Sequence, residues 1–565
     1  MRHLSSIALG AALLLGLHTA QAQYLPHHMT EDEQRMLPLV RPATRGITTP
    51  PAQPVRTMAQ WEEIAGLCIR WEGTFSRSLL REIVRYAKQE TTVYIVTQSQ
   101  SSVTSYLSAG GVNTQNVVFV NEPSNSIWFR DYGQWPAYFE NVGDQVFIDW
   151  IYNRPRPLDD VVPQALADLI GVPLYETTEA PTDLVNTGGN FMTDGMGTAF
   201  ASELILEENA PGNPYGVTSK TEAQIDQIMS DFMGLDRYIK MEVLPYDGIH
   251  HIDMHMKLLD EETLLVGQYP PGVSDGPQIE TNLNYVLNNF NSSFGTPYKV
   301  VRIPMPPDGN QWPSGNGDYL TYTNAVFVNG TVLVPNYYAQ YDTTAMRIWK
   351  EALPGYRIVG LDCNEVITAS GAIHCITKAI GATDPLRIVH QPLEDTPYIQ
   401  QDYEVSAIVQ HRDGIGTAEV RWTTDTTAGY SSVPMTLTDA TNDIWTGYIP
   451  YQDAGEEVFY HIYAQATTGK QQVRPIVAPV GYWKFDILGS VGIQEPETAS
   501  AWYDAQNHVV WTRVSESEIS LTDLSGRAIA TGRTDSMGRW DVAGTAPGMY
   551  LIRLGNSTAQ RIVLH

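Results

Sequence analysis

Apolar positions between residues 60 and 395 follow two alternating patterns. Short apolar runs predict β-strands, and longer stretches with an apolar residue every three or four positions predict amphipathic helices. Strands are predicted at residues 65–70, 92–97, 117–120, 145–151, 243–244, 264–267, 325–328 and 332–335, and helices at 76–88, 221–233, 279–291 and 344–353. Because the two kinds of element alternate along the chain, we expect an α/β fold for residues 56–395.

The hydrophobic pattern changes after residue 395. Alternating apolar and polar residues, separated by turn residues, occupy segments 403–410, 418–423, 432–436, 445–449, 458–464 and 472–476. Short strands at this spacing are typical of a β-sandwich, so we expect an immunoglobulin-like domain over residues 396–488. Residues 489–565 show no helical periodicity and are expected to form a further small β domain.

The first 55 residues precede the α/β pattern and differ from it. Residues 1–22 combine a basic start, a short apolar run and small residues around a potential cut, which is the pattern of a secretory signal peptide. That apolar run is too short to cross a bilayer. Residues 23–55 are rich in proline, threonine and charge without periodicity, so we expect a flexible leader or a pro-segment that is removed. The protein is therefore expected to be exported.

The charge balance and the cysteine count narrow the classes of function. The 565 residues include 35 Lys and Arg against 63 Asp and Glu, a net charge of −28. A chain this acidic is not expected to bind nucleic acid or an anionic membrane surface. Its three cysteines, Cys68, Cys363 and Cys375, are too few for a disulfide-rich secreted domain, and a single internal bridge would leave one thiol free.

Cys375 is the candidate nucleophile among these cysteines. It ends the segment Ser370-Gly-Ala-Ile-His-Cys375, whose small residues allow close approach of the backbone. A thiolate is nucleophilic, but a thiol needs a cationic or polar setting to ionise at neutral pH. The alternative is a cysteine buried in the core, which is the better interpretation of Cys68 in its apolar segment. The sequence leaves Cys363 undecided.

A histidine-rich segment, His250-His-Ile-Asp-Met-His255, is the second candidate for chemistry. On an extended strand, His251, Asp253 and His255 would point to the same side. A histidine beside a carboxylate can move a proton while the carboxylate binds a cation. The same residue types also bind metal ions, and a polar strand end is a third interpretation.

Two further segments carry candidate binding groups. Asp131 lies in the aromatic segment Ile127-Trp-Phe-Arg-Asp-Tyr132, where a carboxylate suits a planar cation, although a surface aspartate beside core aromatics also fits. Arg154 and Arg156 lie on a loop stiffened by proline. Two fixed guanidinium groups suit a carboxylate ligand, and a solvated basic loop is the alternative.

In their order along the chain, these motifs resemble those of the guanidine-modifying enzymes, in the branch that holds agmatine deiminases and the Porphyromonas-type peptidylarginine deiminase. The resemblance covers about residues 50–390 and implies a five-bladed α/β propeller, the pentein fold, with the active site at one end of its pseudo-fivefold axis. It implies no cofactor and no metal. The motifs are Trp128-x-Arg-Asp131, Tyr152-Asn-Arg-Pro-Arg-Pro157, Gly188-Gly-Asn190 with Asp194-Gly195, His251-x-Asp253, Tyr322-Thr-Asn324 and His374-Cys375.

The resemblance also implies catalytic roles. Cys375 would attack the guanidinium carbon and form a covalent thiouronium, and His251 would act first as general acid and then as base. Asp131 and Asp253 would bind the guanidinium nitrogens, and Asn324 would lie near the catalytic centre. Such an enzyme is a hydrolase of the C–N bonds of linear amidines.

The same resemblance implies a substrate site. Trp128 and Ile249 would line the pocket, and Arg154 and Arg156 would hold the carboxylate of a C-terminal arginine. The first hypothesis is therefore a protein-arginine deiminase that converts peptidyl arginine to citrulline and ammonia. Agmatine has no carboxylate for the two arginines, so agmatine deimination to N-carbamoylputrescine is the second hypothesis.

Two hypotheses from other classes stay open. One is a metal-dependent hydrolase built on His250, His251, Asp253 and His255, and the other is a surface adhesin with a degenerate enzyme domain. The C-terminal residues 489–565 resemble the sorting domain of type IX secretion. That resemblance implies secretion machinery as a partner and a product that is secreted or attached to the outer-membrane surface.

Overall fold

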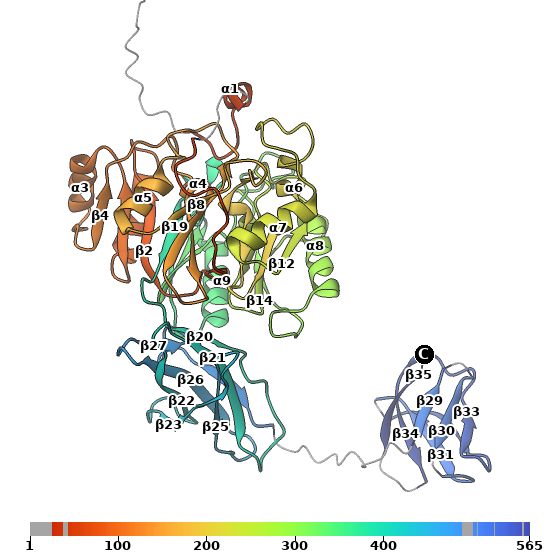
Figure 1. The fold of residues 1–565 in the computed structure, drawn as a ribbon. Coiled ribbons are helices and arrows are strands. Elements are labelled where there is room, and N and C mark those ends of the chain that lie inside the picture. Colours follow the sequence, from red (N-terminus) through yellow and green to blue (C-terminus); the bar gives the residue numbers. More distant parts are fainter. Residues whose placement is uncertain are drawn as a thin grey trace, which may run out of the picture. The chain divides into compact units, whose positions relative to one another are not determined.

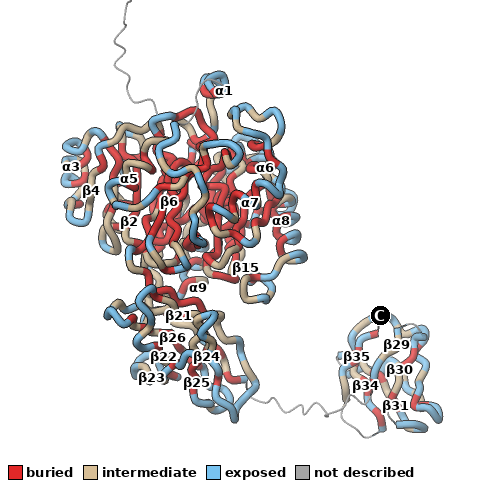
Figure 2. Tube along the Cα trace, viewed as in Figure 1, coloured by how far each residue is buried: buried red, intermediate tan, exposed pale blue. Residues whose placement is uncertain are grey.

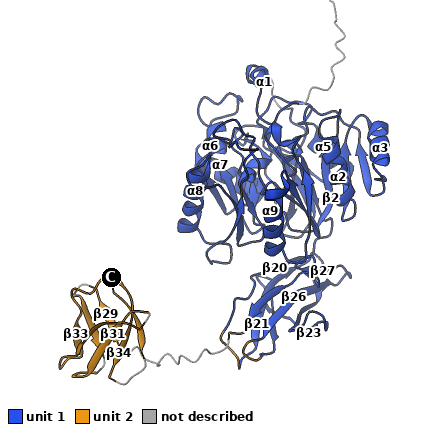
Figure 3. Ribbon diagram, turned by 180° about the vertical axis from the view of Figure 1, so that it is seen from behind, with its two compact units in different colours: residues 1–396, 400–452, 456–486 blue, residues 397–399, 453–455, 487–565 orange. Residues whose placement is uncertain are grey.

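The computed structural model describes residues 25–37, 43–488 and 501–564, with gaps at 506, 513, 525 and 556–558. These residues fall into two units (Figure 3): one holds residues 1–396, 400–452 and 456–486, and the other holds residues 397–399, 453–455 and 487–565. The predicted signal peptide at residues 1–22 lies outside the described residues. Among the helices that the structure describes, none is long and apolar enough to cross a membrane.

Strand and helix alternate through the α/β region of the first unit (Figure 1), and its strands form five sheets of three or four strands. The first sheet contains β1 (Val55–Thr57), β5 (Trp135–Phe139), β6 (Gln145–Asp149) and β8 (Leu174–Glu176). The second contains β10 (Met192–Thr193), β11 (Thr198–Ser202) and β12 (Arg237–Met241), and the third β13 (Met256–Leu258), β14 (Thr263–Gln268) and β15 (Lys299–Pro304). The fourth contains β16 (Val326–Val328), β17 (Thr331–Asn336) and β18 (Arg357–Asp362), and the fifth β19 (Thr377–Gly381), β2 (Ile64–Arg70), β3 (Thr92–Val96) and β4 (Val117–Val120). A separate pair joins β7 (Ile151–Tyr152) to β9 (Val185–Asn186).

Each of the five sheets repeats one local topology. Two neighbouring strands pair antiparallel and the next strand pairs parallel, as in β10–β11–β12 and β13–β14–β15. The fifth sheet joins the end of the region to its start, because β19 pairs antiparallel with β2. Parallel neighbours need a crossover connection, usually a helix. The helices in these connections are α2 (Arg77–Ala87), α3 (Gln100–Ala109), α5 (Val162–Ile170), α6 (Leu204–Glu208), α7 (Glu222–Met233), α8 (Gly276–Asn289) and α9 (Ala339–Ala352).

Helix α7 shows how the sequence specifies these elements. Thr221 caps its start in a capping box with Gln224, and Gly234 ends it in the left-handed conformation, with φ 69°. The helix predicted at residues 221–233 is therefore confirmed, because the caps and the apolar stripe are both visible in the sequence. The buried stripe consists of Ile225, Ile228, Met229, Phe232 and Met233.

Three predicted elements differ from the structure. The strand predicted at 243–244 is instead β12, at Arg237–Met241. The apolar pattern of this strand is interrupted by the buried Lys240, which forms ion pairs with acidic residues of α7. The predicted strand 145–151 is divided, because β6 ends at Asp149 and β7 begins at Ile151 in another sheet. The helix predicted at 344–353 begins earlier, at Ala339. The prediction placed its start too late because the first turn of the helix lacks the apolar pattern on which the prediction depended.

Buried residues concentrate inside the α/β region (Figure 2). One apolar cluster extends across several sheets and includes Leu67 of β2 and Val266 of β14. The same cluster contains Trp128, Ile249 and Cys375. Because a close-packed interior permits little movement, the core holds these candidate site residues in place.

Residues 387–486 form two antiparallel sheets in the same unit (Figure 1). One sheet has the order β20 (Arg387–His390), β21 (Tyr403–Gln410), β25 (Ile444–Ile449) and β24 (Thr436–Asp439). The other has the order β23 (Ser431–Pro434), β22 (Ile415–Thr423), β26 (Glu457–Ala466) and β27 (Gln471–Arg474), with β28 (Trp483–Asp486) beside β26. Strand β20 pairs with β21 and ends at His390, so these sheets begin before residue 396, the predicted start of the immunoglobulin-like domain.

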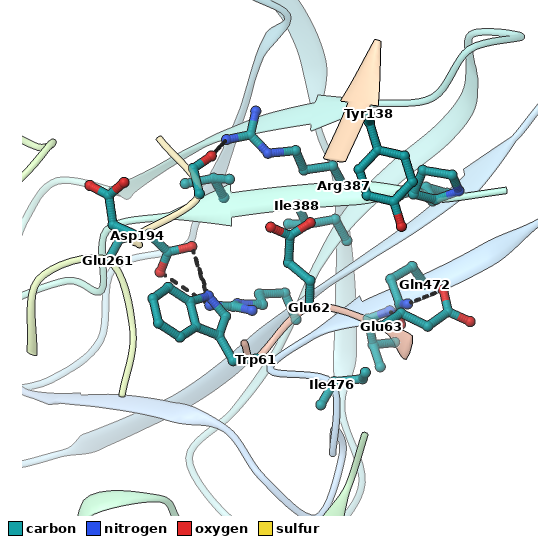
Figure 4. Close-up of a pocket in the computed structure, with 16 residues that line it drawn as sticks. Trp61, Glu62, Glu63, Tyr138, Asp194, Glu261, Arg387, Ile388, Gln472 and Ile476 are labelled. Atoms are coloured by element: carbon teal, nitrogen blue, oxygen red, sulfur yellow. Dashed lines mark hydrogen bonds and ion pairs between the residues drawn. The ribbon is translucent and has the colours of Figure 1, made fainter. Parts of the chain in front are cut away.

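Charged side chains join these β-sheets to the α/β region. Lys470 pairs with Glu63 at 2.8 Å, and the buried Glu261 pairs with Arg474 at 3.1 Å. Figure 4 shows a pocket that Glu63 and Glu261 line, where Trp61 also donates its indole N–H to Glu261. Cys375 does not line this pocket, so the pocket is not the candidate active site.

The second unit contains two small antiparallel sheets. One has the order β29 (Ala501–Asp504), β30 (Val509–Thr512) and β33 (Arg539–Asp541). The other has the order β32 (Ala528–Arg533), β31 (Glu518–Thr522), β34 (Gly548–Leu554) and β35 (Gln560–Leu564). The core of this unit includes Val510, Leu521 and Ile552.

Residues 25–37 lie against the α/β region. They include α1 (Glu31–Met36), which begins with a capping box between Thr30 and Glu33. The side chain of His27 is fully buried. The flexible leader expected for residues 23–55 is therefore wrong for residues 25–37, because buried contacts that sequence periodicity does not show hold this part in place.

Candidate active site

Cys375 lies in the turn between η4 (Ile367–Ala369) and β19 and is fully buried. Asn324, just before β16, donates its side-chain N–H to Cys375 Sγ over 3.1 Å. The oxygen of the same amide accepts the backbone N–H groups of His374 and Cys375 at 3.0 and 3.3 Å. One side chain therefore fixes the position of the thiol and also donates to it.

Asp253 and His374 flank the thiol. Asp253 Oδ2 lies 3.6 Å from Cys375 Sγ and 2.6 Å from His374 Nδ1. The second ring nitrogen of His374, Nε2, faces Gln60 Oε1 at 3.1 Å. Burial raises the pKa of Asp253 well above its ordinary value, and the negative charge of Asp131 raises it further.

His251 stands at the start of the short helix η3 (Ile252–Met254), not on a strand. The expectation that His251, Asp253 and His255 share one strand face is wrong, because this turn separates their directions. His251 Nδ1 lies 3.6 Å from Asp131 Oδ1, and burial lowers the pKa of His251 well below its ordinary value. The ring of His255 has no hydrogen-bond partner among the described residues, and burial lowers its pKa to about 3.

Asp131, on α4 (Phe129–Tyr132), accepts the backbone N–H of Gly189 on its Oδ1 at 3.1 Å. A methyl group at Gly189 would lie 2.3 Å from His251 Nδ1, and one at Gly188 would lie 2.0 Å from a carbonyl oxygen. The double-glycine motif is therefore needed because the backbone passes directly against the site. Burial opposes ionisation of Asp131, but the charges of His27 and His251 outweigh it and hold its pKa below the ordinary value.

Arg154 and Arg156 are buried, which excludes the solvated basic loop considered from the sequence. Arg156 binds the carboxylate of Glu33 through Nε at 2.6 Å and through a second guanidinium nitrogen at 3.3 Å. Arg154 Nε donates to the backbone carbonyl of His27 at 3.1 Å. Trp128 is buried beside them, and its ring stacks on that of His27 with a centroid separation of 4.2 Å.

The thiol is surrounded by groups of both charge signs. Burial raises the pKa of Cys375 well above its ordinary value, and the carboxylates of Asp253 and Asp131 raise it further. Burial also lowers the pKa of the neighbouring Arg130 to about 10. A cation bound between the two carboxylates would offset their charge and favour the thiolate. The buried Ile249 adds an apolar side chain to this core.

The motif order and this geometry agree with a comparison of whole sequences. The profile of the Porphyromonas-type peptidyl-arginine deiminases matches residues 56–380, more than half of the chain. The chain belongs to this family. It is thereby a deiminase, a hydrolase that acts on the C–N bonds of amidines. The family membership expected from the motifs is confirmed.

Individual relatives give the same result. A protein of Vibrio parahaemolyticus that is assigned as an agmatine deiminase is 26% identical over 296 residues, which cover 47% of this chain and 79% of the relative. The solved agmatine deiminase of Enterococcus faecalis is 19% identical, covers 60% of this chain and 99% of its own, and has a TM-score of 0.51. A solved structure assigned as a peptidyl-arginine deiminase is 21% identical, covers 58% and 99%, and has a TM-score of 0.50. The α/β region therefore has the fold of these deiminases.

The candidate active site takes one segment from each of the five sheets. Asp131 precedes β5, Gly189 precedes β10 and Asp253 precedes β13. Asn324 precedes β16 and Cys375 precedes β19. Each of these strands opens the antiparallel pair of its sheet, so the residues occupy equivalent places in a repeated topology. Residues far apart in the sequence therefore lie close together, because each precedes the equivalent strand of its own sheet and these strand starts surround the candidate site.

The metal site considered from the sequence does not form in this deiminase. Among the described residues, no three of His250, His251, Asp253 and His255 have ligand atoms within 4.8 Å of one another. Among the described residues, a different group, His27, Asp131 and His251, has ligand atoms within 4.8 Å of one another. In that group, His27 already forms a hydrogen bond with Asp131.

Three site residues lie outside the set expected from the sequence. His374 was noted only as the neighbour of Cys375, although it contacts Asp253 directly. Lys257 is buried beside the site, donates to Gln60 Oε1 at 2.7 Å, and has its pKa lowered to about 7 by burial. His27 lies in a segment without periodicity, and the only signal near it is the capping pattern that starts α1. The three free cysteines are all buried, which fits the core interpretation of Cys68.

Proposed function

We propose that this deiminase acts on arginine in peptides, with a C-terminal arginine as its preferred substrate, and releases citrulline and ammonia. The observation that supports this proposal is the two-point contact of the buried Arg156 with a carboxylate, that of Glu33. A C-terminal arginine carries a carboxylate of its own, and a paired guanidinium–carboxylate contact is strong and geometrically specific. Agmatine carries no such group.

The first half-reaction follows from the groups around the thiol. The substrate guanidinium binds between Asp131 and Asp253, and its charge lowers the pKa of Cys375 that those carboxylates raise. The thiol proton passes to His251, and the thiolate attacks the guanidinium carbon. His251 then gives that proton to the departing nitrogen, which leaves as ammonia. The product is a thiouronium in which Sγ is bonded to the former guanidinium carbon.

The second half-reaction replaces the sulfur with oxygen. His251, now neutral, removes a proton from a water molecule that attacks the thiouronium carbon. The C–S bond breaks and returns its electron pair to Cys375, and the carbon keeps the new oxygen as the urea group of citrulline. The hydroxyl proton on that oxygen passes to the thiolate and regenerates the thiol, and His251 releases its proton to solvent. Asn324 donates to Sγ in both states and so stabilises the thiolate when it forms.

We further propose that the five repeated sheets are the five blades of a propeller. The support is the repeated antiparallel–parallel topology and the pairing of β19 with β2, which joins the last part of the region to the first. The two antiparallel sheets of residues 387–486 fit the proposed immunoglobulin-like domain. The small β unit from residue 501 fits the proposed sorting domain of type IX secretion.

Export remains part of the proposal. The pattern of residues 1–22 favours a signal peptide, and a substrate outside the cell suits an enzyme of peptides better than one of polyamine synthesis. We therefore propose a secreted or outer-membrane-attached protein that reaches its location through the secretion machinery. Detection of the protein in the medium or on the cell surface, and its loss from both when residues 501–564 are deleted, would support this location.

Agmatine deimination is the second candidate function. Relatives assigned as agmatine deiminases match most of the α/β region, which favours this alternative. The two candidates share the mechanism and differ only in what the buried arginines bind. They therefore make different predictions for Arg156.

The test measures citrulline-type product and ammonia from three substrates. These are a short peptide that ends in arginine, the same peptide with an internal arginine, and agmatine, each with and without a chelator. We expect chelator-resistant turnover, with kcat/KM at least about tenfold higher for the C-terminal arginine because one charge-assisted contact is worth that much. Agmatine as the best substrate would replace the proposal by its alternative.

Substitution of Arg156, the residue proposed to bind the substrate carboxylate, sharpens this test. Arg156→Ala should lower kcat/KM for the C-terminal arginine by about 10- to 100-fold and leave agmatine within about threefold, because only the peptide loses a charged contact. Equal losses on both substrates would contradict the proposal that Arg156 binds the carboxylate of the substrate. Cys375→Ser should abolish turnover of every substrate, and retained turnover would contradict the covalent mechanism.

A further inference from the structure

The N-terminal segment, residues 25–36, binds along the candidate active site through its backbone. The carbonyl oxygens of residues 25, 26 and 27 accept in turn from Trp128 Nε1 at 3.0 Å, the Arg156 guanidinium at 2.7 Å and Arg154 Nε at 3.1 Å. All three donors come from residues assigned to the substrate pocket. Because they donate to main-chain oxygens, they could donate in the same way to the backbone of another peptide.

The His27 ring occupies the place expected for a substrate guanidinium. It stacks almost parallel on Trp128, with an angle of 7° between the rings. Its Nε2 forms a hydrogen bond with the Asp131 carboxylate, and its Nδ1 faces the carbonyl oxygen of Ser370 at 2.8 Å. With acceptors at both ring nitrogens, the doubly protonated imidazolium satisfies both contacts. Like a guanidinium, it is a planar cation that donates in its own plane.

The ring also lies beside the nucleophile. A methyl group at Gly371 would lie 3.0 Å from His27 Nδ1 and 3.1 Å from Cys375 Cβ. The histidine ring and the cysteine therefore both border the space that a side chain at Gly371 would take. Because the His27 side chain is fully buried, a substrate guanidinium cannot bind between Trp128 and Asp131 until this ring leaves.

Glu33 supplies the second part of the resemblance to a substrate. Its carboxylate makes the two-point contact with Arg156 that we assign to the α-carboxylate of a C-terminal arginine. The capping box with Thr30 holds the Glu33 side chain at the start of α1, so the helix presents the carboxylate in a fixed direction. The segment thus places a cation and a carboxylate at the two ends of the site.

We propose that the N-terminal segment is an intramolecular, substrate-like ligand that competes with substrate for the site of the full-length deiminase until it is displaced or removed. This inference rests on the proposed function. A tethered ligand competes at a high effective concentration, so it raises KM more than it lowers kcat. The partner that fits the site is a peptide, because three consecutive carbonyl groups are bound.

The first experiment compares His27→Ala with the matched control Arg35→Ala in the full chain. Arg35 lies on α1 in the same segment, but its side chain is largely exposed and pairs with Asp32 rather than with the site. For a peptide ending in arginine, His27→Ala should lower KM at least about tenfold with kcat nearly unchanged. Arg35→Ala should leave both values unchanged. Alkylation of Cys375 by iodoacetamide should become faster by a similar factor in His27→Ala alone.

The second experiment places a substrate group in the segment itself. In His27→Arg, the new guanidinium lies between Trp128 and Asp131, so we expect the enzyme to deiminate its own position 27. Mass spectrometry of the purified protein detects this as the mass gain of deimination at that residue. The natural Arg35 of the same molecule serves as the internal control and should stay unmodified. The double variant with Cys375→Ser should also stay unmodified.

The outcomes separate this inference from the proposed function. Equal KM values and equal alkylation rates in the wild type and His27→Ala, with turnover in both, would overturn the inference and leave the function standing. Faster alkylation of Cys375 in His27→Ala without turnover of any substrate would support the occupied site and reject the function. A lower KM together with deimination at position 27 would support both.

Discussion

At the residue scale, the chemistry depends on how a buried thiol is balanced between opposing groups. Asn324 donates to Cys375 Sγ and so stabilises the thiolate, whereas the carboxylate of Asp253 lies 3.6 Å from Sγ and destabilises it. With burial added, the pKa of Cys375 stands well above its ordinary value. In the proposed mechanism, a bound cation would favour ionisation of the thiol, which would link activation of the nucleophile to the presence of substrate.

The two neighbours of the thiol should shift its titration in opposite directions. Asp253→Asn removes a negative charge, so the pKa of Cys375 should fall and alkylation should speed up at neutral pH. Turnover should nevertheless be lost, because the guanidinium loses a carboxylate. The measurement is the rate of iodoacetamide alkylation against pH, in parallel with the deimination assay.

Asn324→Ala is the matched control for this prediction. It removes a donor to the sulfur, so the alkylation profile should move to higher pH, the opposite direction. Turnover should fall about 100-fold, as for loss of one preorganised donor. Shifts of the same sign in the two variants would show that altered access to the thiol, not its charge environment, controls the rate.

At the element scale, the candidate site residues are positioned by the short turn before the first strand of each sheet more than by the strand itself. The turn η2 (Gly188–Asn190) passes so near the site that neither glycine has room for a side chain. The turn η3 places His251 and Asp253 on two different neighbours, Asp131 and Cys375. These turns are short and irregular, so strand periodicity does not predict them. The motif residues were visible in the sequence, but their directions were not.

Gly189→Ala tests the close approach of this turn. The added methyl group would meet His251 Nδ1 at 2.3 Å, and the turn cannot move back because Gly188 abuts the Arg130 carbonyl. We expect at least about a 100-fold loss of kcat/KM from displacement of the histidine, with about 1–3 kcal/mol of lost stability. Gly248→Ala, where a methyl group meets nothing within 4 Å, is the control and should change neither value.

At the scale of the whole molecule, the α/β region and the β-sheets of residues 387–486 are joined by charges instead of a continuous apolar core. Glu261 and Arg474 pair while both are largely buried, and Trp61 also donates to the glutamate. The apolar cluster that holds Cys375 does not include residues of the β-sheets. We therefore expect this charged junction to affect the stability of the protein and not the reaction.

Arg474→Met should therefore lower stability without altering the chemistry. It leaves the Glu261 carboxylate buried and unpaired, which costs about 3–5 kcal/mol and appears as a lower midpoint of chemical denaturation. Lys484→Met, which breaks a half-exposed pair with Glu457, should cost less than about 1 kcal/mol. A shift in Arg474→Met no larger than that of the control would show that the Glu261 pair does not stabilise the junction.

Local signals determined much of this protein directly from its sequence. The α7 caps and stripe, the alternation of strands and helices, and the ordered motifs around Asp131, His251 and Cys375 are all encoded within a few residues. Helix periodicity and capping act between neighbours in the chain, so no knowledge of the fold is needed to read them. The family and the candidate nucleophile followed from these local patterns.

Only the tertiary structure decided which distant groups meet. The strand β12 was missed because its Lys240 is neutralised by α7, and the extended strand expected at His251 is a turn. The contact between His27 and Asp131 joins residues that are 104 positions apart in the sequence, and no periodicity within residues 23–55 predicts it. Long-range contacts depend on the complementarity of two surfaces that form only after folding. Local sequence patterns therefore determined the elements and motifs of this protein, and packing determined which residues lie against the candidate site.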